Sequence, residues 1–235
     1  MDPSEAKARV EEAVEFVKRH KIVAILRAAN PEAAVARALE LAELGCRLIE
    51  ITLDTTDFEK VVRELSEKLP SSCMLGVGTV MEADKVNELV AMGLNFRFCL
   101  SPINPEGFVA RCHANGIMAV PAAFTSNEMW KAHHTEGARM IKLFHASLIP
   151  PATLKGMLGV GPLGAMNIMP SGGIDADAAP AWLAAGAASL GMGSKFAGKD
   201  IQLVEGDPGL EAAKQEWAQN GRGAVKRLMD SLKTQ

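Results

Sequence analysis

Residues 22–52 read IVAILRAANPEAAVARALELAELGCRLIEIT, which is the pattern of one complete strand–helix–strand unit. The apolar run Ile22–Leu26 predicts a buried strand. Asn30 and Pro31 are typical of a helix start, because asparagine caps the first turn and proline needs no hydrogen-bond partner there. A second apolar run, Arg47–Leu53, predicts the next strand. Strands separated by a helix are typical of a parallel sheet.

The same unit repeats along the rest of the chain. Further apolar runs predict strands at Met74–Val77, Phe96–Leu100, Ile117–Val120, Met140–Phe144, Ala165–Met169 and Ala188–Met192. Helical periodicity predicts helices at about 31–44, 56–68, 82–92, 105–115, 125–136, 151–158, 176–185 and 209–232. Eight such units, without a cofactor-binding crevice motif, predict an α/β fold of the closed (β/α)8 TIM-barrel type, with an open doubly wound sheet as the alternative. Residues 4–19 predict an extra N-terminal helix at the bottom of the barrel, and we expect residues 1–235 to form a single domain.

The composition argues against several classes of protein. The chain has 235 residues, of which 48% are hydrophobic and 23% charged, and its net charge is -3, which is typical of a globular protein. No lysine and arginine cluster stands out, so we expect neither nucleic acid nor a membrane surface as a partner. No apolar stretch approaches the roughly 20 residues of a membrane span. The polar N-terminus is unlike a secretory signal, and the four cysteines lack zinc-site spacing, so we expect a cytoplasmic protein with reduced thiols.

Two charged residues interrupt runs that should be buried. Lys142 lies within Met140–Phe144, and Glu50 lies within Leu48–Ile51. These residue types are almost never fully buried unless they are paired or functional. A desolvated lysine has a lowered pKa and attacks carbonyl carbons as the neutral amine, and a nearby carboxylate can move protons. The alternative, a structural ion pair, is the weaker reading because a buried pair adds little net stability.

Strand parity places four polar residues at one end of the barrel. Alternate residues of a barrel strand point inward, and active sites of this fold lie at the carboxyl ends of the strands. On the third strand, this parity assumes that Leu75, Val77 and Thr79 all point inward. Taken alone, Arg27 is equally consistent with a rim residue, and Thr79 with a helix cap. The residues expected to converge are Arg27, Glu50, Thr79 and Lys142.

One glycine-rich turn follows the seventh predicted strand, and another ends the eighth. They are Pro170-Ser171-Gly172-Gly173 and Gly191-Met192-Gly193-Ser194. Backbone N–H groups in such turns hold phosphate, and barrels often bind phosphate in the loops after strands seven and eight. Plain tight turns are the alternative interpretation.

These features together resemble a known family. The chain is similar to the class I pyruvate aldolases that cleave 2-dehydro-3-deoxy-6-phosphogluconate (KDPG) and 4-hydroxy-2-oxoglutarate (KHG). The similarity extends from Lys21 to about Ala197. The segments that match in order and spacing are Ile22–Arg27, Leu48–Thr52, Gly76–Val80, Ser101–Pro102, Ile141–Phe144, Pro170–Gly173 and Gly191–Ser194.

The resemblance implies a homotrimer of (β/α)8 barrels with no metal and no organic cofactor. It implies that Lys142 forms a Schiff base with the substrate and that Glu50 shuttles protons. The substrate-binding residues that it implies are Arg27 and Thr79 for the carboxylate, Pro102 and Phe144 for the pocket walls, and Ser171, Gly172, Gly173, Gly193 and Ser194 for the phosphate.

The expected activity is that of a carbon–carbon lyase which cleaves KDPG to pyruvate and glyceraldehyde 3-phosphate. An aldolase for KHG or for 2-dehydro-3-deoxy-6-phosphogalactonate is the first alternative, because Asp54, Ala122 and His145 depart from the family's usual residues near the pocket mouth. A phosphate-binding isomerase or a non-catalytic sugar-phosphate binder is the second alternative. Lys142 argues against the second, because binding alone needs no desolvated lysine within a strand.

Overall fold

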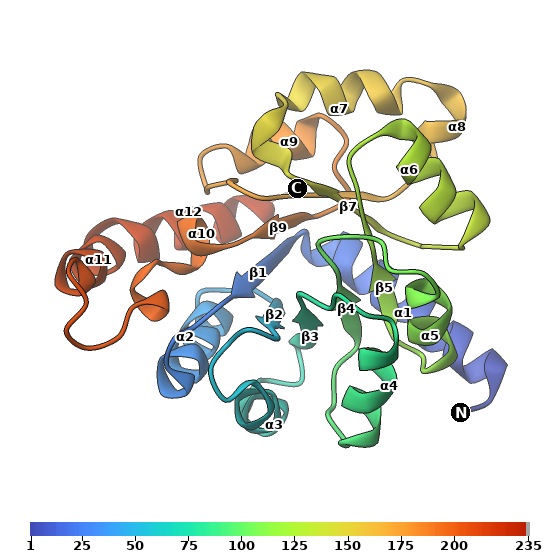
Figure 1. The fold of residues 1–235 in the computed structure, drawn as a ribbon. Coiled ribbons are helices and arrows are strands. Elements are labelled where there is room, and N and C mark those ends of the chain that lie inside the picture. The colour runs from blue at the N-terminus through green and yellow to red at the C-terminus, as the bar shows by residue number, and fades with distance from the viewer. Residues whose placement is uncertain (234–235) are drawn as a thin grey trace.

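Parallel strands form a barrel with helices on its outside (Figure 1). The computed structural model describes residues 1–233. The strands are β1 (Ile22–Leu26), β2 (Leu48–Thr52), β3 (Met74–Gly78), β4 (Phe98–Leu100), β5 (Met118–Val120), β6 (Ala122–Ala123), β7 (Ile141–Phe144), β8 (Ile168–Ser171) and β9 (Leu190–Met192). They pair in the order β5-β4-β3-β2-β1-β9-β8-β7-β6.

The predicted fifth strand is divided in two at Pro121. Its first part, β5, pairs with β4, and its second part, β6, pairs with β7. Pro121 has no N–H to donate to a ladder, but its carbonyl oxygen accepts a hydrogen bond from the backbone nitrogen of Lys142 at 2.9 Å. The bent strand therefore joins the two ends of the sheet, and the predicted TIM barrel is confirmed.

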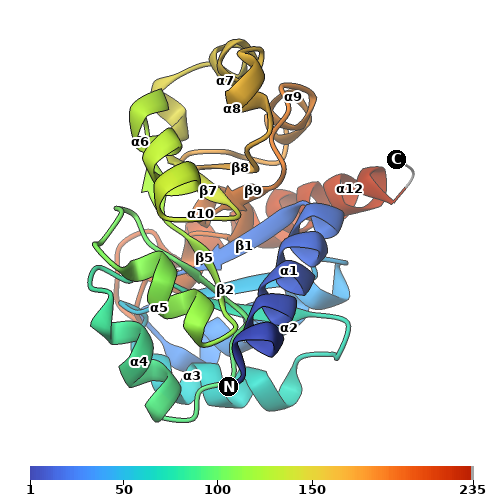
Figure 2. The ribbon, with the colours of Figure 1, turned by 90° about the vertical axis from the view of Figure 1, so that its right-hand side faces the viewer.

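The helices lie between successive strands and cover the outer face of the barrel (Figure 2). Their bounds are α2 (Pro31–Glu43), α3 (Phe58–Lys68), α4 (Asp84–Ala91), α5 (Phe108–Ala114), α6 (Ser126–Trp130), η1 (Lys131–Thr135), η2 (Ala146–Leu148), α7 (Pro151–Leu158), α8 (Gly161–Gly164), α9 (Ala179–Ala184), α10 (Ser194–Ala197), η3 (Asp200–Gln202), α11 (Leu210–Glu216), η4 (Trp217–Gly221) and α12 (Arg222–Leu232). The predicted cap of α2 is present, because the Asn30 side chain accepts a hydrogen bond from the backbone nitrogen of Ala33 at 2.9 Å. Within residues 1–233, no helix is long and apolar enough to cross a membrane.

The N-terminal helix α1 (Pro3–His20) closes the bottom of the barrel, as predicted. Its buried residues are Ala6, Val10, Ala13, Val14 and Val17. All of them except Ala6 share one apolar cluster with residues of the barrel interior. The other buried members of that cluster are Met140, which precedes β7, and the strand residues Val23, Leu48, Met74, Phe98, Leu100, Met118, Val120 and Met169. The amino end of the barrel is thus filled with apolar atoms, which leaves only the carboxyl end open for chemistry.

The seventh predicted strand was placed too early in the chain. The expected range was Ala165–Met169, whereas β8 covers Ile168–Ser171. Ala165 and Met166 instead follow the one-turn helix α8, where the backbone nitrogen of Met166 donates to the oxygen of Leu163 at 3.1 Å. The apolar pattern was misleading because Met166 is buried in the outer core just as a strand residue would be. Ser171, expected in a turn, is therefore held inside the sheet.

The inward face of β3 was also predicted wrongly. Leu75 and Val77 belong to the core between the sheet and the helices, so they point outward. The inward positions are Met74, Gly76 and Gly78. A Cβ atom on Gly76 would clash with the Phe98 ring, and one on Gly78 would clash with the Glu50 carboxylate. Glycine is needed at these positions because neighbouring strands fill the interior, and an apolar pattern cannot reveal residues that have no side chain.

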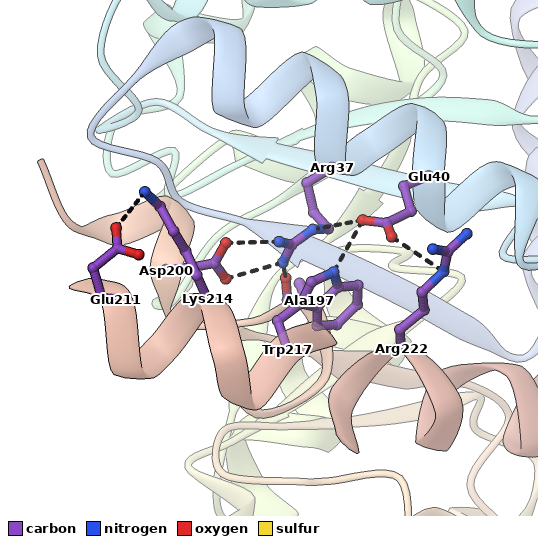
Figure 3. Close-up of polar contacts among 8 residues, drawn as sticks. All are labelled: Arg37, Glu40, Ala197, Asp200, Glu211, Lys214, Trp217 and Arg222. Carbon is purple, nitrogen blue, oxygen red and sulfur yellow. Dashed lines mark hydrogen bonds and ion pairs between the residues drawn. The ribbon is translucent and has the colours of Figure 1, made fainter. Parts of the chain in front are cut away.

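The C-terminal segment is fastened to α2 by a buried arginine (Figure 3). The Arg37 guanidinium donates to the Asp200 carboxylate at 2.8 Å, to Glu40 at 3.1 Å and to the carbonyl oxygen of Ala197. It also lies 3.8 Å from the ring centroid of Trp217, whose indole N–H donates to Glu40 at 3.0 Å. These contacts hold α10 and η3 against α2, next to the carboxyl end of the barrel.

Candidate active site

A cavity of about 260 Å³ lies at the carboxyl end of the barrel. Every site residue expected from the sequence lines it. These residues are Arg27, Glu50, Thr79, Pro102, Lys142, Phe144, Ser171, Gly172, Gly173, Gly193 and Ser194. The cavity is also lined by Ile25, Thr52, His145 and Gln202, to which no role was assigned from the sequence.

Lys142 lies at the base of this cavity on β7. Its side chain is 6% exposed, and Nζ lies 5.0 Å from the centroid of the Phe144 ring. Burial lowers the pKa of Lys142, the positive charge of Arg27 lowers it further, and Glu50 opposes both effects. Among residues 1–233, no hydrogen-bond acceptor or carboxylate is bonded to Nζ. The amine is therefore shielded, unpaired and biased toward its neutral, nucleophilic form.

Glu50 faces the same cavity from β2 and is 1% exposed. Burial raises the pKa of this carboxyl to about 7, although the charges of Lys142 and Arg27 act in the opposite direction; Asp54 adds a small further rise. Its Oε2 atom is buried and has no hydrogen-bond partner in the described chain. A carboxyl that titrates near neutral pH and has a free oxygen is suited to accept and return a proton.

Arg27 and Thr79 form one polar wall of the cavity. The Arg27 Nη2 atom lies 3.4 Å from Thr79 Oγ1, and Arg27 Nε forms an ion pair with Asp54 Oδ2 at 2.8 Å. Thr79 follows β3 with a φ of 62°, which is the left-handed region that non-glycine residues seldom adopt. This turn of the backbone brings Thr79 into the cavity although its strand parity points it outward. The ion pair with Asp54 was not expected, because Asp54 was noted only as a departure from the family.

The two glycine turns form the opposite part of the lining. Gly172 and Gly173 have φ values of 100° and 79°, which favour glycine. The His145 ring packs directly on Gly172, where an added Cβ atom would lie 2.6 Å from ring atoms. Ser171 is buried at the end of β8, and Gly193 and Ser194 stand at the start of α10. The turns expected to hold a phosphate therefore face the same cavity as Lys142.

Gln202 is a cavity residue that the sequence analysis missed. It is the last residue of η3, which begins at Asp200, and Asp200 is held by Arg37 from α2. No local pattern around Gln202 indicates a site, because its position depends on a contact between residues 163 positions apart.

Some other hollows of the molecule are larger, but among residues 1–233 none of them is lined by a buried lysine and a buried carboxylate. One of them, of about 580 Å³, lies beside α1 and is lined by Arg9, Arg97, Glu5 and Glu12 among others. Arg97 forms an ion pair there with Glu12 at 2.9 Å. In the described residues, no group of three or more His, Cys, Asp or Glu side chains is arranged to hold a metal ion.

A family match and two similar proteins point to the same family. The family described as KDPG and KHG aldolase matches residues 13–207. The chain is 33% identical over 176 residues to a probable 2-dehydro-3-deoxy-6-phosphogalactonate aldolase of Rhizobium meliloti, covering 74% of this chain and 81% of that protein. It is 26% identical over 183 residues to the 2-dehydro-3-deoxy-6-phosphogalactonate aldolase of Escherichia coli, covering 77% and 87%. A solved structure named native KDPGal has the same fold, with a TM-score of 0.74 at 23% identity over 91% of this chain and 96% of that one.

Proposed function

The chain belongs to the KDPG and KHG aldolase family of carbon–carbon lyases, and we propose that it cleaves a phosphorylated 2-keto-3-deoxy sugar acid through a Schiff base on Lys142. The observation that carries this proposal is the pair formed by Lys142 and Glu50. Both are buried in one cavity, and neither is neutralised by a direct ion pair within residues 1–233. A structural ion pair would place the charged atoms in contact, so the geometry supports chemistry over packing.

The proposed reaction begins with the neutral amine of Lys142. Nζ adds to the C2 ketone of the substrate, and loss of water produces a protonated imine. Glu50, acting directly or through a water, removes the proton from the C4 hydroxyl. The C3–C4 bond then breaks, its electron pair moves into the imine to form the enamine of pyruvate, and the aldehyde leaves. Protonation at C3 and hydrolysis of the imine release pyruvate and restore Lys142.

The polar walls of the cavity are suited to bind the carboxylate at one end of the substrate and the phosphate at the other. Arg27 and Thr79 are suited to hold the carboxylate next to C2, because a guanidinium and a hydroxyl both donate to carboxylate oxygens. Asp54 pairs with Nε and Thr79 lies next to Nη2, so the N–H groups of Nη1 remain for the substrate. The backbone N–H groups of the turns at Gly172, Gly173 and Gly193 are suited to hold a phosphate at the other end.

Two epimeric phosphosugar acids are the leading substrates. KDPG was the expectation from the sequence, with KHG or 2-dehydro-3-deoxy-6-phosphogalactonate as the alternative. The relatives compared above are both named for the galactonate compound. We therefore place 2-dehydro-3-deoxy-6-phosphogalactonate first and KDPG second; both yield pyruvate and glyceraldehyde 3-phosphate.

A substrate panel tests this proposal. Pyruvate release is measured with the two phosphosugar acids and with KHG, and each mixture is treated with borohydride before peptide mass analysis. We expect the highest kcat/KM with a phosphosugar acid and a reduced pyruvyl adduct on Lys142. An adduct on any other residue would overturn the mechanism, and preference for KHG would overturn the substrate class.

We also propose that the protein is a cytoplasmic homotrimer. The family resemblance supports the trimer, and its mass in solution, measured by light scattering, tests it. The four cysteines are free thiols, and Cys46, Cys99 and Cys112 are fully buried, which suits a reducing compartment.

A further inference from the structure

The imidazole ring of His145 is held on three sides at the mouth of the cavity. Its Nδ1 atom lies 2.9 Å from Ser147 Oγ. Its ring centroid lies 4.6 Å from that of Phe144, at an angle of 43°. The ring also contacts Gly172, one of the turn residues of the proposed phosphate site. A side chain held in this way loses little further rotational freedom when it binds a ligand.

The glycine turn and the His145 ring form one packed unit. A Cβ atom on Gly172 would lie 2.6 Å from Cε1 and Nδ1 of the ring, so any other residue there would displace it. A Cβ atom on Gly173 would lie 2.9 Å from the Cβ of Ser147. The backbone nitrogen of Ser147 donates to the carbonyl oxygen of Gly172 at 3.1 Å. The orientation of the ring is therefore set by the same turn that is suited to hold a phosphate.

One ring nitrogen of His145 is left for a ligand. The Ser147 hydroxyl can donate to Nδ1, and the neutral ring then carries its hydrogen on Nε2. Within residues 1–233, Nε2 has no hydrogen-bond partner. Of the described residues that line the cavity, only Arg27, Lys142 and His145 carry a basic side chain. In the proposed reaction Arg27 binds the carboxylate and Lys142 attacks the ketone, so His145 is the basic group that remains for the other end of the substrate.

We propose that His145 binds the phosphate group of the substrate through Nε2 and thereby selects phosphorylated substrates, an inference that rests on the aldolase function proposed above. The N–H group donates to a phosphate oxygen while the backbone of the glycine turn donates to others. Ser147 is a positioning residue, because it orients the ring through Nδ1 without touching the substrate.

The test compares His145→Phe and His145→Gln with the unaltered protein. Phenylalanine keeps a ring of similar shape but has no donor, whereas glutamine keeps an N–H group. A hydrogen bond to a charged group corresponds to about a 10- to 100-fold change in binding. For His145→Phe we expect KM for the phosphosugar acid, and Ki for inorganic phosphate as a competitor, to rise about 10- to 100-fold. We expect kcat to change by less than about 3-fold, and His145→Gln to recover part of the loss.

Two controls separate a binding role from a packing role. His134→Phe changes an exposed histidine that stacks on Trp130 outside the cavity, and it should leave KM and Ki unaltered. Borohydride trapping of pyruvate on Lys142 should be equally efficient in every variant, because pyruvate has no phosphate. Ser147→Ala should raise KM by a smaller factor than His145→Phe.

The outcomes distinguish this inference from the proposed function. If the unaltered protein forms no adduct on Lys142, the proposed function fails. If it cleaves a phosphosugar acid while His145→Phe leaves both KM and the phosphate Ki unchanged, only the role of His145 is overturned. An equal loss of kcat/KM for KHG and for the phosphosugar acid would also overturn it, because the ring would then act on the shape of the site.

Discussion

Arg37 in α2 and Lys142 in β7 are each only 6% exposed, yet their surroundings are opposite. Arg37 donates to two carboxylates and a carbonyl oxygen and stacks on Trp217 (Figure 3). Lys142 has the Phe144 ring near Nζ. The Glu50 carboxyl lines the same cavity but forms no direct ion pair with Lys142 within residues 1–233. Equal burial thus serves structure in one place and, as proposed, chemistry in the other.

The difference shows why pairing is more informative than burial. A buried guanidinium stays charged, so it must be satisfied by bidentate and stacking contacts. A buried amine without a direct partner can give up its proton, which makes it a nucleophile. A buried cation with a complete set of partners therefore indicates a structural role, and one without partners indicates a functional role.

Replacing Lys142 should have the largest effect on activity. We expect Lys142→Met to lower kcat/KM by about 10⁴-fold or more and to abolish the borohydride adduct, because Lys142 is the only lysine among residues 1–233 that lines the cavity. The free energy of unfolding should not fall, since methionine removes a desolvated amine. Pyruvate release and thermal melting measure the two effects. Lys155→Met, on the exposed surface of α7, is the control; a clear loss of stability in Lys142→Met would contradict the comparison.

Replacing Glu50 should have the next largest effect. We expect Glu50→Gln to lower kcat by about 10²- to 10⁴-fold, because the amide cannot accept the C4 hydroxyl proton. Imine formation with pyruvate should persist, since it needs only Lys142. Single-turnover cleavage and trapping with pyruvate separate these steps. Unaltered kcat in this variant would remove Glu50 from proton transfer.

Replacing Arg37 should reduce stability more than any change at Lys142. We expect Arg37→Met to lower the free energy of unfolding by about 3 kcal/mol, because Asp200 and Glu40 lose their shared partner. The melting temperature should fall by roughly 6 to 12 °C. Arg222→Met is the matched control, since Arg222 pairs with Glu40 at 3.4 Å on an exposed surface and should contribute less than about 1 kcal/mol. Equal losses in the two variants would show that the burial of Arg37 does not matter.

The free energy of unfolding should depend on pH because the pKa of Glu50 is raised in the folded protein. Its pKa is raised from 4.5 to about 7, so the folded protein binds a proton that the unfolded chain has already released. The stabilisation from this group is fully present below pH 4.5 and is lost as pH rises through about 7. The loss amounts to about 3 kcal/mol. Denaturant unfolding measures the free energy of unfolding of the unaltered protein and of Glu50→Gln between pH 4.5 and 8. As pH rises, this free energy should fall in the unaltered protein relative to the variant. Parallel curves for the two proteins would rule out the pKa shift.

Much of the fold and site could be predicted because local patterns carry that information. Apolar runs and helix caps predict the strand–helix units, and Lys142 and Glu50 stand out as charges within buried runs. The inward face of β3 could not be predicted, because Gly76 and Gly78 have no side chains from which to infer a pattern. Thr79 lines the cavity although the parity argument for it was wrong, since it follows β3 with a positive φ and does not continue the strand geometry.

By itself, the sequence determined the repeated strand–helix unit and the two charges embedded in buried strands, because periodicity and burial are local properties. The tertiary structure alone decided which polar groups have partners. The pairing of Arg27 with Asp54, the docking of Arg37 against Asp200 and the packing of His145 on Gly172 join segments separated along the chain. Such contacts depend on how the barrel closes and how its loops pack, and that closure distinguishes the satisfied charge of Arg37 from the unpaired amine of Lys142.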